Sequence, residues 1–459
     1  MRQYKKIAAS LQNPHASSDL KLTMLMAENT PPKEVQDNTR RNSIKHKIWL
    51  QQAEEHDSPA IMINSGPSIN NHIEDIKNLQ RKGAVVFAMN GASKWAHKHG
   101  INVDHQVIAD ATEGAATHVD KDAQHHLFAS QCNPKTTDAS TWLTLWHLNR
   151  DGIEDLLPPE RVEQGGYVLV GGDATVGVIS LCVAYAMGYR DFHVFGMDTS
   201  HKKGKGHAFD QPINKNMPTM AMEWGGEKYV ISMGLKLQIG AFFRYTHDLK
   251  AIGCEFAIYG DGLLQAMYNA DFSKLSEREK YQLMWVFDEY GRYSPGEQEA
   301  QEYLDQFKPE GMIIDFGCGT GRAGVLFAKT NKVFLIDITD NSRDEGALRL
   351  PFKQWDITVP IPIDAPNGFC TDVMEHIPTD DVETVINNIM GSAENVFFQI
   401  STVPDTAGAM VGLPLHLTVR PHKWWADLFE ILGYEVKYQQ DKGPASTFYI
   451  QHIGENNAS

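Results

Sequence analysis

A glycine-rich segment at residues 311–324 most constrains what this chain can fold into. An apolar run there carries an acid at Asp315, and three alternating glycines follow at Gly317, Gly319 and Gly321. Glycine lets backbone approach a ligand closely, and the start of a helix offers free N–H groups. The segment therefore predicts a strand, then a ligand-binding loop, then a helix of small residues.

The spacing of these glycines distinguishes two kinds of nucleotide site. A dinucleotide-binding loop has the form GxGxxG, and its third glycine would fall where this chain has Arg322. The third glycine instead stands one position earlier, at Gly321. An oxidoreductase that binds a nicotinamide cofactor is therefore the lesser alternative for this loop.

Length and composition bound the remaining choices. A chain of 459 residues is too long for one ordinary core, so two domains are expected. The net charge of −16 argues against broad binding to nucleic acid. No apolar run approaches the ~20 residues of a membrane span, and the basic N-terminus lacks the apolar stretch of a signal peptide. The five cysteines are scattered without a CxxC pair, which favours a cytoplasmic location.

The order of apolar and polar segments predicts two α/β domains. Residues 1–58 form a polar lead-in with helical stretches such as Asn42–Glu55, and strands then alternate with helices over 59–268. Residues 269–289 are expected to be a helical linker, and 290–459 the second domain. Alternating strands and helices favour parallel sheets. The predicted fold class is thus α/β, with two Rossmann-like domains of open, mostly parallel sheets flanked by helices.

Acids follow the later strands of the second domain. Asp337 ends the second strand, where a carboxylate can accept hydrogen bonds from both hydroxyls of a ribose. Asp356 ends a third segment, and it either accepts from an adenine amino group or is a solvated turn acid. A fourth strand runs into Asp372-Val-Met-Glu-His-Ile377.

These ordered motifs resemble the class I S-adenosylmethionine-dependent methyltransferases, in particular the small-molecule type with an Asp-Val-Leu-Glu-His-Ile-like fourth motif. The resemblance covers roughly residues 290 to 455, and Val396–Ile400 and Trp424-Trp425 agree with it. It implies S-adenosylmethionine as cofactor and a Rossmann-like domain. The cofactor-binding residues that it implies are Asp315, Gly317, Gly319 and Gly321 on the methionine side, Asp337 at the ribose, Asp356 near the adenine, and Asp372.

His376 is the candidate catalytic residue of this domain. It either serves as a general base or packs beneath the cofactor. No Pro-Cys motif surrounds Cys370, and no Asn/Asp-Pro-Pro-Tyr motif is present. Both absences disfavour methylation of nucleic-acid bases, so the expected acceptor is a small molecule or a glycan.

The first domain carries polar residues at successive strand ends. Gly66-Pro67-Ser68 stands between a strand and a helix, where free amides and a hydroxyl suit a phosphate. Asn90 follows the second strand and Asp110 the third. Because ligands bind at the carboxyl ends of parallel strands, these residues predict a nucleotide crevice.

Three acids are candidate Mg²⁺ ligands in this crevice. Asp110, Asp173 and Asp198 supply the hard oxygen atoms that Mg²⁺ prefers and could offset phosphate charge. Each is alternatively a helix cap, Asp173 above all. His207, beyond a Lys/Gly-rich loop, is a catalytic acid or base, a phosphate contact, or a solvated loop residue.

The motifs of residues 35–268 resemble the MptE-like family, which includes the motility accessory factors. Some members are 6-hydroxymethylpterin diphosphokinases that use ATP with magnesium, and others are implicated in sugar transfer to flagellin. Their fold is similar to that of some sialyltransferases. The motifs that carry the resemblance are Gly66-Pro67-Ser68, Phe128–Cys132, Leu145–His147, Gly171–Gly177, Gly196–Asp198 and His207-Ala208.

Together these resemblances predict a bifunctional transferase. One domain methylates a small molecule or glycan, and the other transfers diphosphate from ATP to a pterin-like alcohol. The alternatives for the first domain are a nucleotide-sugar glycosyltransferase or a non-catalytic module that delivers substrate. The expected partners are these substrates and a nucleotide, with neither a specific nucleic acid nor a membrane. The methyl acceptor and the oligomeric state stay open.

Overall fold

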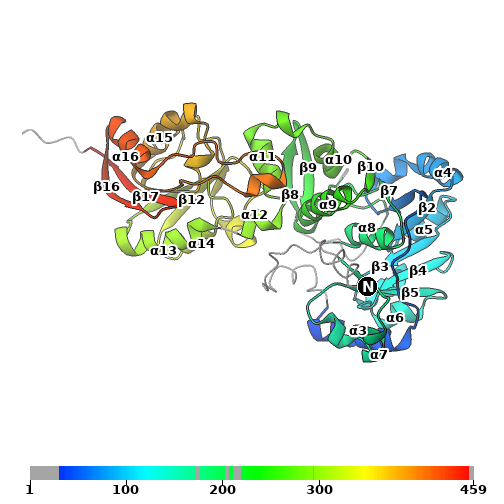
Figure 1. Cartoon of the computed structure of the whole chain (residues 1–459). Helices are drawn as coiled ribbons and strands as arrows, with labels where there is room; N and C mark the ends of the chain where they lie inside the picture. The colour runs from blue at the N-terminus through cyan, green and yellow to red at the C-terminus, as the bar shows by residue number, and fades with distance from the viewer. Residues whose placement is uncertain (1–29, 172–174, 202–205, 210–218, 293, 454–459) are drawn as a thin grey trace, which may run out of the picture. The chain divides into compact units, whose positions relative to one another are not determined.

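The computed structural model describes residues 30–171, 175–201, 206–209, 219–292 and 294–453. The chain divides into two compact units, Met1–Asn269 and Ala270–Ser459. Each unit is built on a mostly parallel sheet with helices packed against it (Figure 1). The prediction of two Rossmann-like α/β units is thereby confirmed, and a short helix precedes the first sheet.

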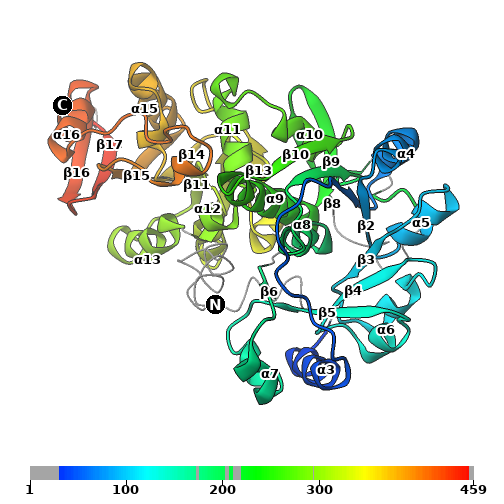
Figure 2. The same ribbon diagram turned by 45° about the vertical axis from the view of Figure 1, so that its right-hand side comes forward.

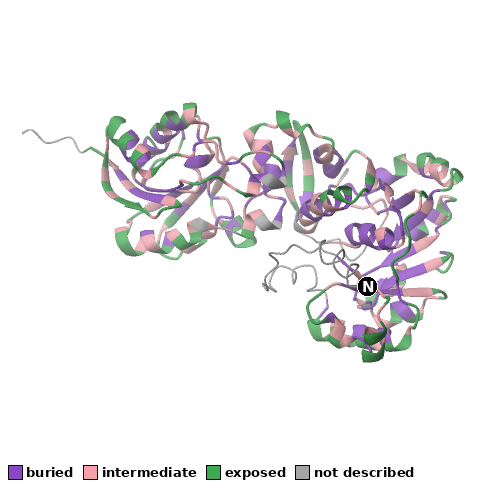
Figure 3. Ribbon diagram, viewed as in Figure 1, coloured by how far each residue is buried: buried purple, intermediate pink, exposed green. Residues whose placement is uncertain are grey.

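The sheet of the first unit has eight strands in the order β10-β7-β1-β2-β3-β4-β5-β6, and its pairings are parallel. Its central strands are short apolar runs that are buried on both faces, as parallel sheets require (purple in Figure 3). The strands are β1 Ala60–Ile63, β2 Val85–Met89, β3 His105–Ile108, β4 His125–Ala129, β5 Leu143–Leu148, β6 Leu169–Val170, β7 Asp191–Phe195 and β10 Glu255–Tyr259.

The strand order reverses at β1. The chain runs outward from β1 through β2 to β6, and then returns to place β7 on the other side of β1. The loops that follow β1 and β7 therefore meet at the carboxyl edge of the sheet. Such a switch point is where open α/β sheets bind their ligands.

The lead-in helix differs from its predicted bounds. Helix α3 covers Pro32–Lys45 rather than Asn42–Glu55. A proline suits the first turn of a helix, because the N–H it lacks would be unpaired there. After Lys45 the chain extends, since Trp49 forms a parallel bridge with Leu145. Helix α3 lies beside α6 in both views (Figures 1 and 2).

The other helices of the first unit connect its strands, and α8 is apolar all round because it is buried. An antiparallel hairpin, β8 Thr219–Trp224 and β9 Glu227–Ser232, forms a separate two-stranded sheet that sequence analysis did not predict. The helices are α4 Ile73–Arg81, α5 Ala92–Lys98, α6 Pro134–Asp138, α7 Pro159–Gln164, α8 Val176–Ala186, α9 Met233–Ala251 and α10 Leu263–Tyr268.

The sheet of the second unit has the order β13-β12-β11-β14-β15-β17-β16. Its first five strands are parallel and follow a doubly wound order, whereas β17 and β16 pair antiparallel at one edge. Here the strand order reverses between β11 and β14. The strands are β11 Met312–Phe316, β12 Lys332–Asp337, β13 Phe352–Gln354, β14 Ala365–Thr371, β15 Ala393–Ser401, β16 Tyr434–Asp441 and β17 Ala445–His452.

Helices bury both faces of this sheet. One core contains Tyr303 and Phe327 from α13 and α14, and the other contains Val385 and Trp425 from α15 and α16. Among the described residues, no helix combines the length and the apolar character needed to cross a membrane. The helices are α11 Glu277–Met284, α12 Asp288–Arg292, α13 Pro295–Phe307, α14 Arg322–Phe327, α15 Val382–Met390 and α16 His422–Ile431.

Candidate functional site

The second unit contains a cavity of about 810 Å³ at the carboxyl ends of β11, β12, β13 and β14. It lies at the switch point of the sheet, where a ligand is expected. Five predicted site residues line it, whereas Asp315, Gly319 and Gly321 are not among its lining residues. The five are Gly317, Asp337, Asp356, Asp372 and His376.

The glycine loop can be built only from glycine. Gly317, Gly319 and Gly321 have φ angles of 69°, 49° and 72°, which side chains rarely adopt. A Cβ at Gly317 would lie 2.3 Å from Cγ2 of Val373, which follows β14. A Cβ at Gly319 would lie 3.0 Å from the Trp285 ring. The loop therefore packs directly against the wall of the cavity.

Asp337 ties the glycine loop to β12. Its Oδ2 accepts a hydrogen bond from the Gly319 N–H at 2.9 Å. Its Oδ1 accepts from the N–H and the hydroxyl of Thr339, both at 2.9 Å. A carboxylate offers about four lone-pair sites, so acceptor capacity remains for a ligand. Burial raises the pKa of Asp337, although these donors oppose the shift.

Asp315 is a buried acid at the end of β11. Only 3% of the residue is exposed, and its Oδ2 accepts no hydrogen bond from the described residues. Burial, reinforced by the negative charge of Asp337, raises the pKa of Asp315 to about 7. An unsatisfied carboxylate oxygen behind a glycine loop suits a cationic ligand group.

We expect Asp315 to make the stability of the protein depend on pH. Because its pKa is higher in the folded than in the unfolded state, the folded state binds more protons between about pH 4 and 7. The free energy of unfolding should therefore fall as the pH rises through this window, by up to about 4 kcal/mol. Urea unfolding of the wild type and of Asp315→Asn at several pH values checks this. An equally steep fall in the variant would contradict the assignment.

The other two predicted acids differ in their surroundings. Asp356 is exposed at the rim, and its Oδ1 accepts from the N–H and the hydroxyl of Thr358. Asp372 has a φ of 52° and accepts a hydrogen bond from Gln399. Burial, helped by the negative charge of Glu299, raises the pKa of Asp372 to about 6, although its hydrogen bonds with Gln399 and Glu375 oppose the shift. A residue held at positive φ beside a cavity is typical of a functional position.

His376 lines the cavity but is a weak base. Burial, chiefly, lowers the pKa of His376 to about 4, so the ring is neutral near pH 7. Its Nδ1 lies 2.8 Å from the Tyr281 hydroxyl and 3.1 Å from the Leu415 carbonyl oxygen. A ring with these partners suits binding or positioning better than proton removal.

Sequence analysis missed three aromatic residues that line the cavity. Tyr281 and Trp285 come from α11 and the turn after it, and Tyr290 from α12. They lie in or directly after the segment predicted as a linker. Tyr281 and Trp285 are four residues apart, which places both side chains on one face of a helix. This spacing is the sequence signal that could have predicted these two as lining residues.

In the first unit, the loops after β1 and β7 are joined through Asp198. The Ser68 N–H donates to Asp198 Oδ2 at 2.7 Å, and the Ser68 hydroxyl donates to Asp198 Oδ1. The Gly66 N–H donates to the Gly196 carbonyl at 2.6 Å. Ser68 and Asp198 are 0% and 4% exposed. This carboxylate therefore fixes the Gly-Pro-Ser segment, in which Pro67 begins a 3-10 helix of five residues.

A second cluster lies beside this junction. The Ser65 hydroxyl is 3.0 Å from Nδ1 of His207, and the Ala208 N–H donates to the Ser65 carbonyl. Burial lowers the pKa of His207. A neutral imidazole next to a serine after β1 can exchange a proton with a bound ligand.

The remaining predicted residues of the first unit follow β2 and β3. Asn90 has a φ of 48°, and its buried Oδ1 accepts no hydrogen bond from the described residues. Asp110 accepts from the Thr112 N–H. Strands β3 and β7 are separated by β1 and β2, which is about 14 Å between strand axes. Asp110 and Asp198 would have to reach across that distance to share one ion, and Asp173 lies outside the described residues.

Comparison with known proteins gives a family match for the first unit. Residues 33–204 match the family model described as 6-hydroxymethylpterin diphosphokinase MptE-like, so the first unit carries an MptE-like domain. Because a diphosphokinase is a transferase, this match supports a transferase. Comparison with curated proteins gave no match.

Among solved structures, the chain is similar to the MAf glycosyltransferase from Magnetospirillum magneticum AMB-1, with 16% identity and a TM-score of 0.38. That likeness covers 64% of this chain and half the length of the glycosyltransferase. The chain is also similar to magnesium protoporphyrin IX methyltransferase from Synechocystis PCC 6803, which was solved with bound SAH, with 15% identity and a TM-score of 0.29. That likeness covers 41% of this chain and 92% of the methyltransferase chain. The N-methyltransferase NodS from Bradyrhizobium japonicum WM9 shows 12% identity and a TM-score of 0.31. The match covers 39% of this chain and 98% of the NodS chain.

Proposed function

We propose that the second unit binds S-adenosylmethionine and transfers its methyl group to a small molecule or a glycan. The observation that carries this proposal is the junction of the glycine loop with Asp337 at the switch-point cavity. Gly317 brings backbone to the cavity wall, and Asp337 faces the same cavity while holding Gly319 in place. Both features are those expected of a site for a nucleoside with a charged tail.

The residues present fit the cofactor in three places. The buried Asp315 carboxyl, with an oxygen that lacks a donor, would pair with the ammonium group of the methionine part. Asp337 has acceptor capacity for ribose hydroxyls, and Trp355 and Ile357 offer apolar surface to the adenine ring. The cofactor itself supplies an activated methyl group on a sulfonium centre.

The three aromatic residues that line the cavity would hold the methyl acceptor. Tyr281, Trp285 and Tyr290 face the cavity from α11 and α12. Rigid aromatic surfaces orient a ring-shaped acceptor at small entropic cost, and orientation is the main contribution a protein makes to a transfer of this kind. His376, neutral near pH 7, would help to orient the acceptor at the cavity wall.

Calorimetric titration of the whole protein with S-adenosylhomocysteine tests this proposal. We expect micromolar binding with one site per chain, and no heat from a matched titration with NADH. Binding of NADH in place of S-adenosylhomocysteine would overturn the proposal in favour of a nicotinamide enzyme.

For the first unit we propose a nucleotide-dependent transfer, with diphosphate from ATP to a pterin-like alcohol as the first choice. The family match and the paired loops after β1 and β7 support it. Ser65 and His207 would contact phosphate or the accepting hydroxyl, and Asp110 would help to hold Mg²⁺. Sugar transfer from a nucleotide sugar and a binding-only role are the alternatives.

Nucleotide titrations distinguish these alternatives. Binding of ATP with Mg²⁺ that weakens at least ~10-fold in Asp110→Ala supports diphosphate transfer, since a carboxylate ligand to the ion is lost. Preference for nucleotide sugars would favour the glycosyltransferase. Binding of neither would leave a module that delivers substrate.

A further inference from the structure

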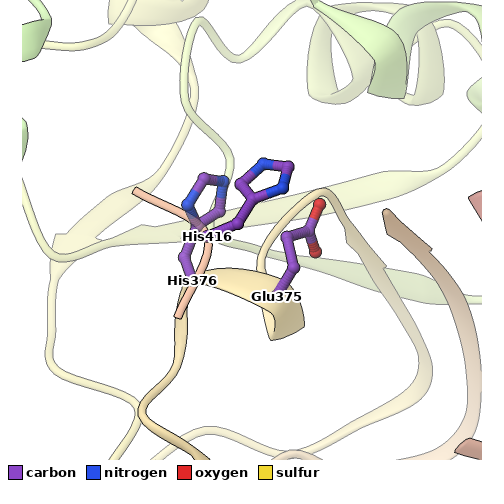
Figure 4. A group of neighbouring side chains, drawn as sticks. All are labelled: Glu375, His376 and His416. Carbon is purple, nitrogen blue, oxygen red and sulfur yellow. The ribbon is translucent and has the colours of Figure 1, made fainter. Parts of the chain in front are cut away.

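Three side chains beside the cavity of the second unit form a group with the character of a metal site. Glu375, His376 and His416 each offer one ligand atom, and these atoms lie within 4.8 Å of one another (Figure 4). The N–H groups of Leu417 and Thr418 donate to the Glu375 carbonyl at 2.7 and 2.9 Å. The loop that carries His416 is therefore fastened to the turn that carries the other two.

Both histidines are oriented through the same ring nitrogen. Nδ1 of His416 lies 2.7 Å from the Val403 carbonyl oxygen, and Nδ1 of His376 lies 3.1 Å from that of Leu415. A carbonyl oxygen can only accept, so the hydrogen bond to Val403 assigns the proton of His416 to Nδ1 and leaves a lone pair on its Nε2. The Tyr281 hydroxyl also lies 2.8 Å from Nδ1 of His376, where it can accept the ring proton or donate its own. Histidines that bind metals are typically held in this way by a carbonyl or a carboxylate.

Glu375 supplies the observation that points to a ligand. The residue is 0% exposed, and its Oε1 accepts from the Ser401 N–H at 3.1 Å. Its Oε2 is buried and receives no hydrogen bond from an amide, an amine or a hydroxyl of the described part of the chain, and the carboxyl group beside Glu375 is that of Asp372, a second acid. A buried carboxylate oxygen without a donor is costly, and a cation beside it would remove that cost.

We propose that Glu375, His376 and His416 bind a divalent first-row transition metal ion such as Zn²⁺. Two imidazole nitrogens and one carboxylate oxygen suit zinc better than magnesium or calcium, which prefer oxygen alone. In a tetrahedral zinc site the ligand atoms stand about 3.3 Å apart, so the group must close when the ion enters. The backbone on both sides of this group is fastened, so the closing movement would come from rotation of the side chains.

Such a site would extend the function of the cavity beyond methyl transfer. Three protein ligands leave one coordination position open, as in catalytic zinc sites. Because His376 also lines the cavity, the open position would face the acceptor and bind an oxygen atom of it. Asp405 accepts from the His416 N–H and adds negative charge nearby, which favours the ion.

The test is metal retention by the full-length chain, independent of any activity. Purified protein is loaded with Zn²⁺, passed over a weak chelator and analysed for metal, and Co²⁺ absorption then reports the geometry. We expect one equivalent in the wild type and an affinity at least ~100-fold lower in His416→Ala and Glu375→Gln. His452→Ala is the matched control, since it removes an exposed histidine of the same unit.

Each outcome decides the proposal. Equal retention in the wild type and in both ligand variants would overturn it, and so would a wild type that retains no metal. The variants are also titrated with S-adenosylhomocysteine. Unchanged cofactor binding shows that they are folded, and it separates failure of the metal site from failure of the methyltransferase proposal.

Discussion

Replacing Asp337 with alanine is expected to weaken the binding of S-adenosylhomocysteine by at least ~100-fold, as measured by calorimetric titration. The Asp337 carboxylate accepts a hydrogen bond from the Gly319 N–H in the loop, and it also lines the cavity. Alanine removes the acceptor for two ribose hydroxyls, and each hydrogen bond to a charged group contributes roughly 1.5–3 kcal/mol. It also leaves the buried donors of Thr339 unpaired.

Two further variants make this experiment specific. Asp337→Asn keeps one acceptor oxygen and should bind with intermediate affinity. Asp364→Ala removes an exposed aspartate of the same unit outside the cavity, and it should bind like the wild type. Tight binding by Asp337→Ala would show that the ribose is held elsewhere and would remove the main support for the proposed cofactor site.

Asp198→Ala is expected to lower the free energy of unfolding by about 2–4 kcal/mol. The change leaves the Ser68 N–H and hydroxyl buried without an acceptor, and it separates the loops after β1 and β7. An unsatisfied buried donor costs about 1–3 kcal/mol, and two are created here. Urea denaturation followed by circular dichroism measures the change.

The same variant decides between a structural and a metal-binding role for Asp198. Asp122→Ala, at an exposed aspartate of the same unit, is the control and should be within ~0.5 kcal/mol of the wild type. Asp198→Asn should retain part of the lost stability. If Asp198→Ala unfolds like the wild type but loses Mg²⁺-dependent nucleotide binding, the carboxylate is a metal ligand and the structural interpretation fails.

The parts of the site that sequence analysis could predict are local in the chain. Gly317, Gly319 and Gly321 follow an apolar strand within six residues of Asp315, and Asp337 ends the next strand. A strand, a loop and a helix are each encoded by neighbouring residues through side-chain period and backbone freedom. The fold class followed from the same signals, because alternation of strands and helices favours parallel sheets.

The lead-in helix shows where local signals fail. Its polar residues are compatible with a helix over either Pro32–Lys45 or Asn42–Glu55. The choice depends on Trp49, whose extended backbone pairs with Leu145 almost a hundred residues later. Tertiary pairing of this kind overrides helix propensity, which differs by less than about 1 kcal/mol per residue.

The amino-acid sequence by itself therefore established the two α/β units and the polar residues that stand at the ends of their strands. Only the tertiary structure decided which side chains meet: Asp198 with Ser68, Tyr281 with His376, and Glu375 with His416. Those partners come from segments far apart in the chain, and sequence spacing carries no information about contacts made across a sheet edge. The strand order brings them together, because it sets which loops share a switch point.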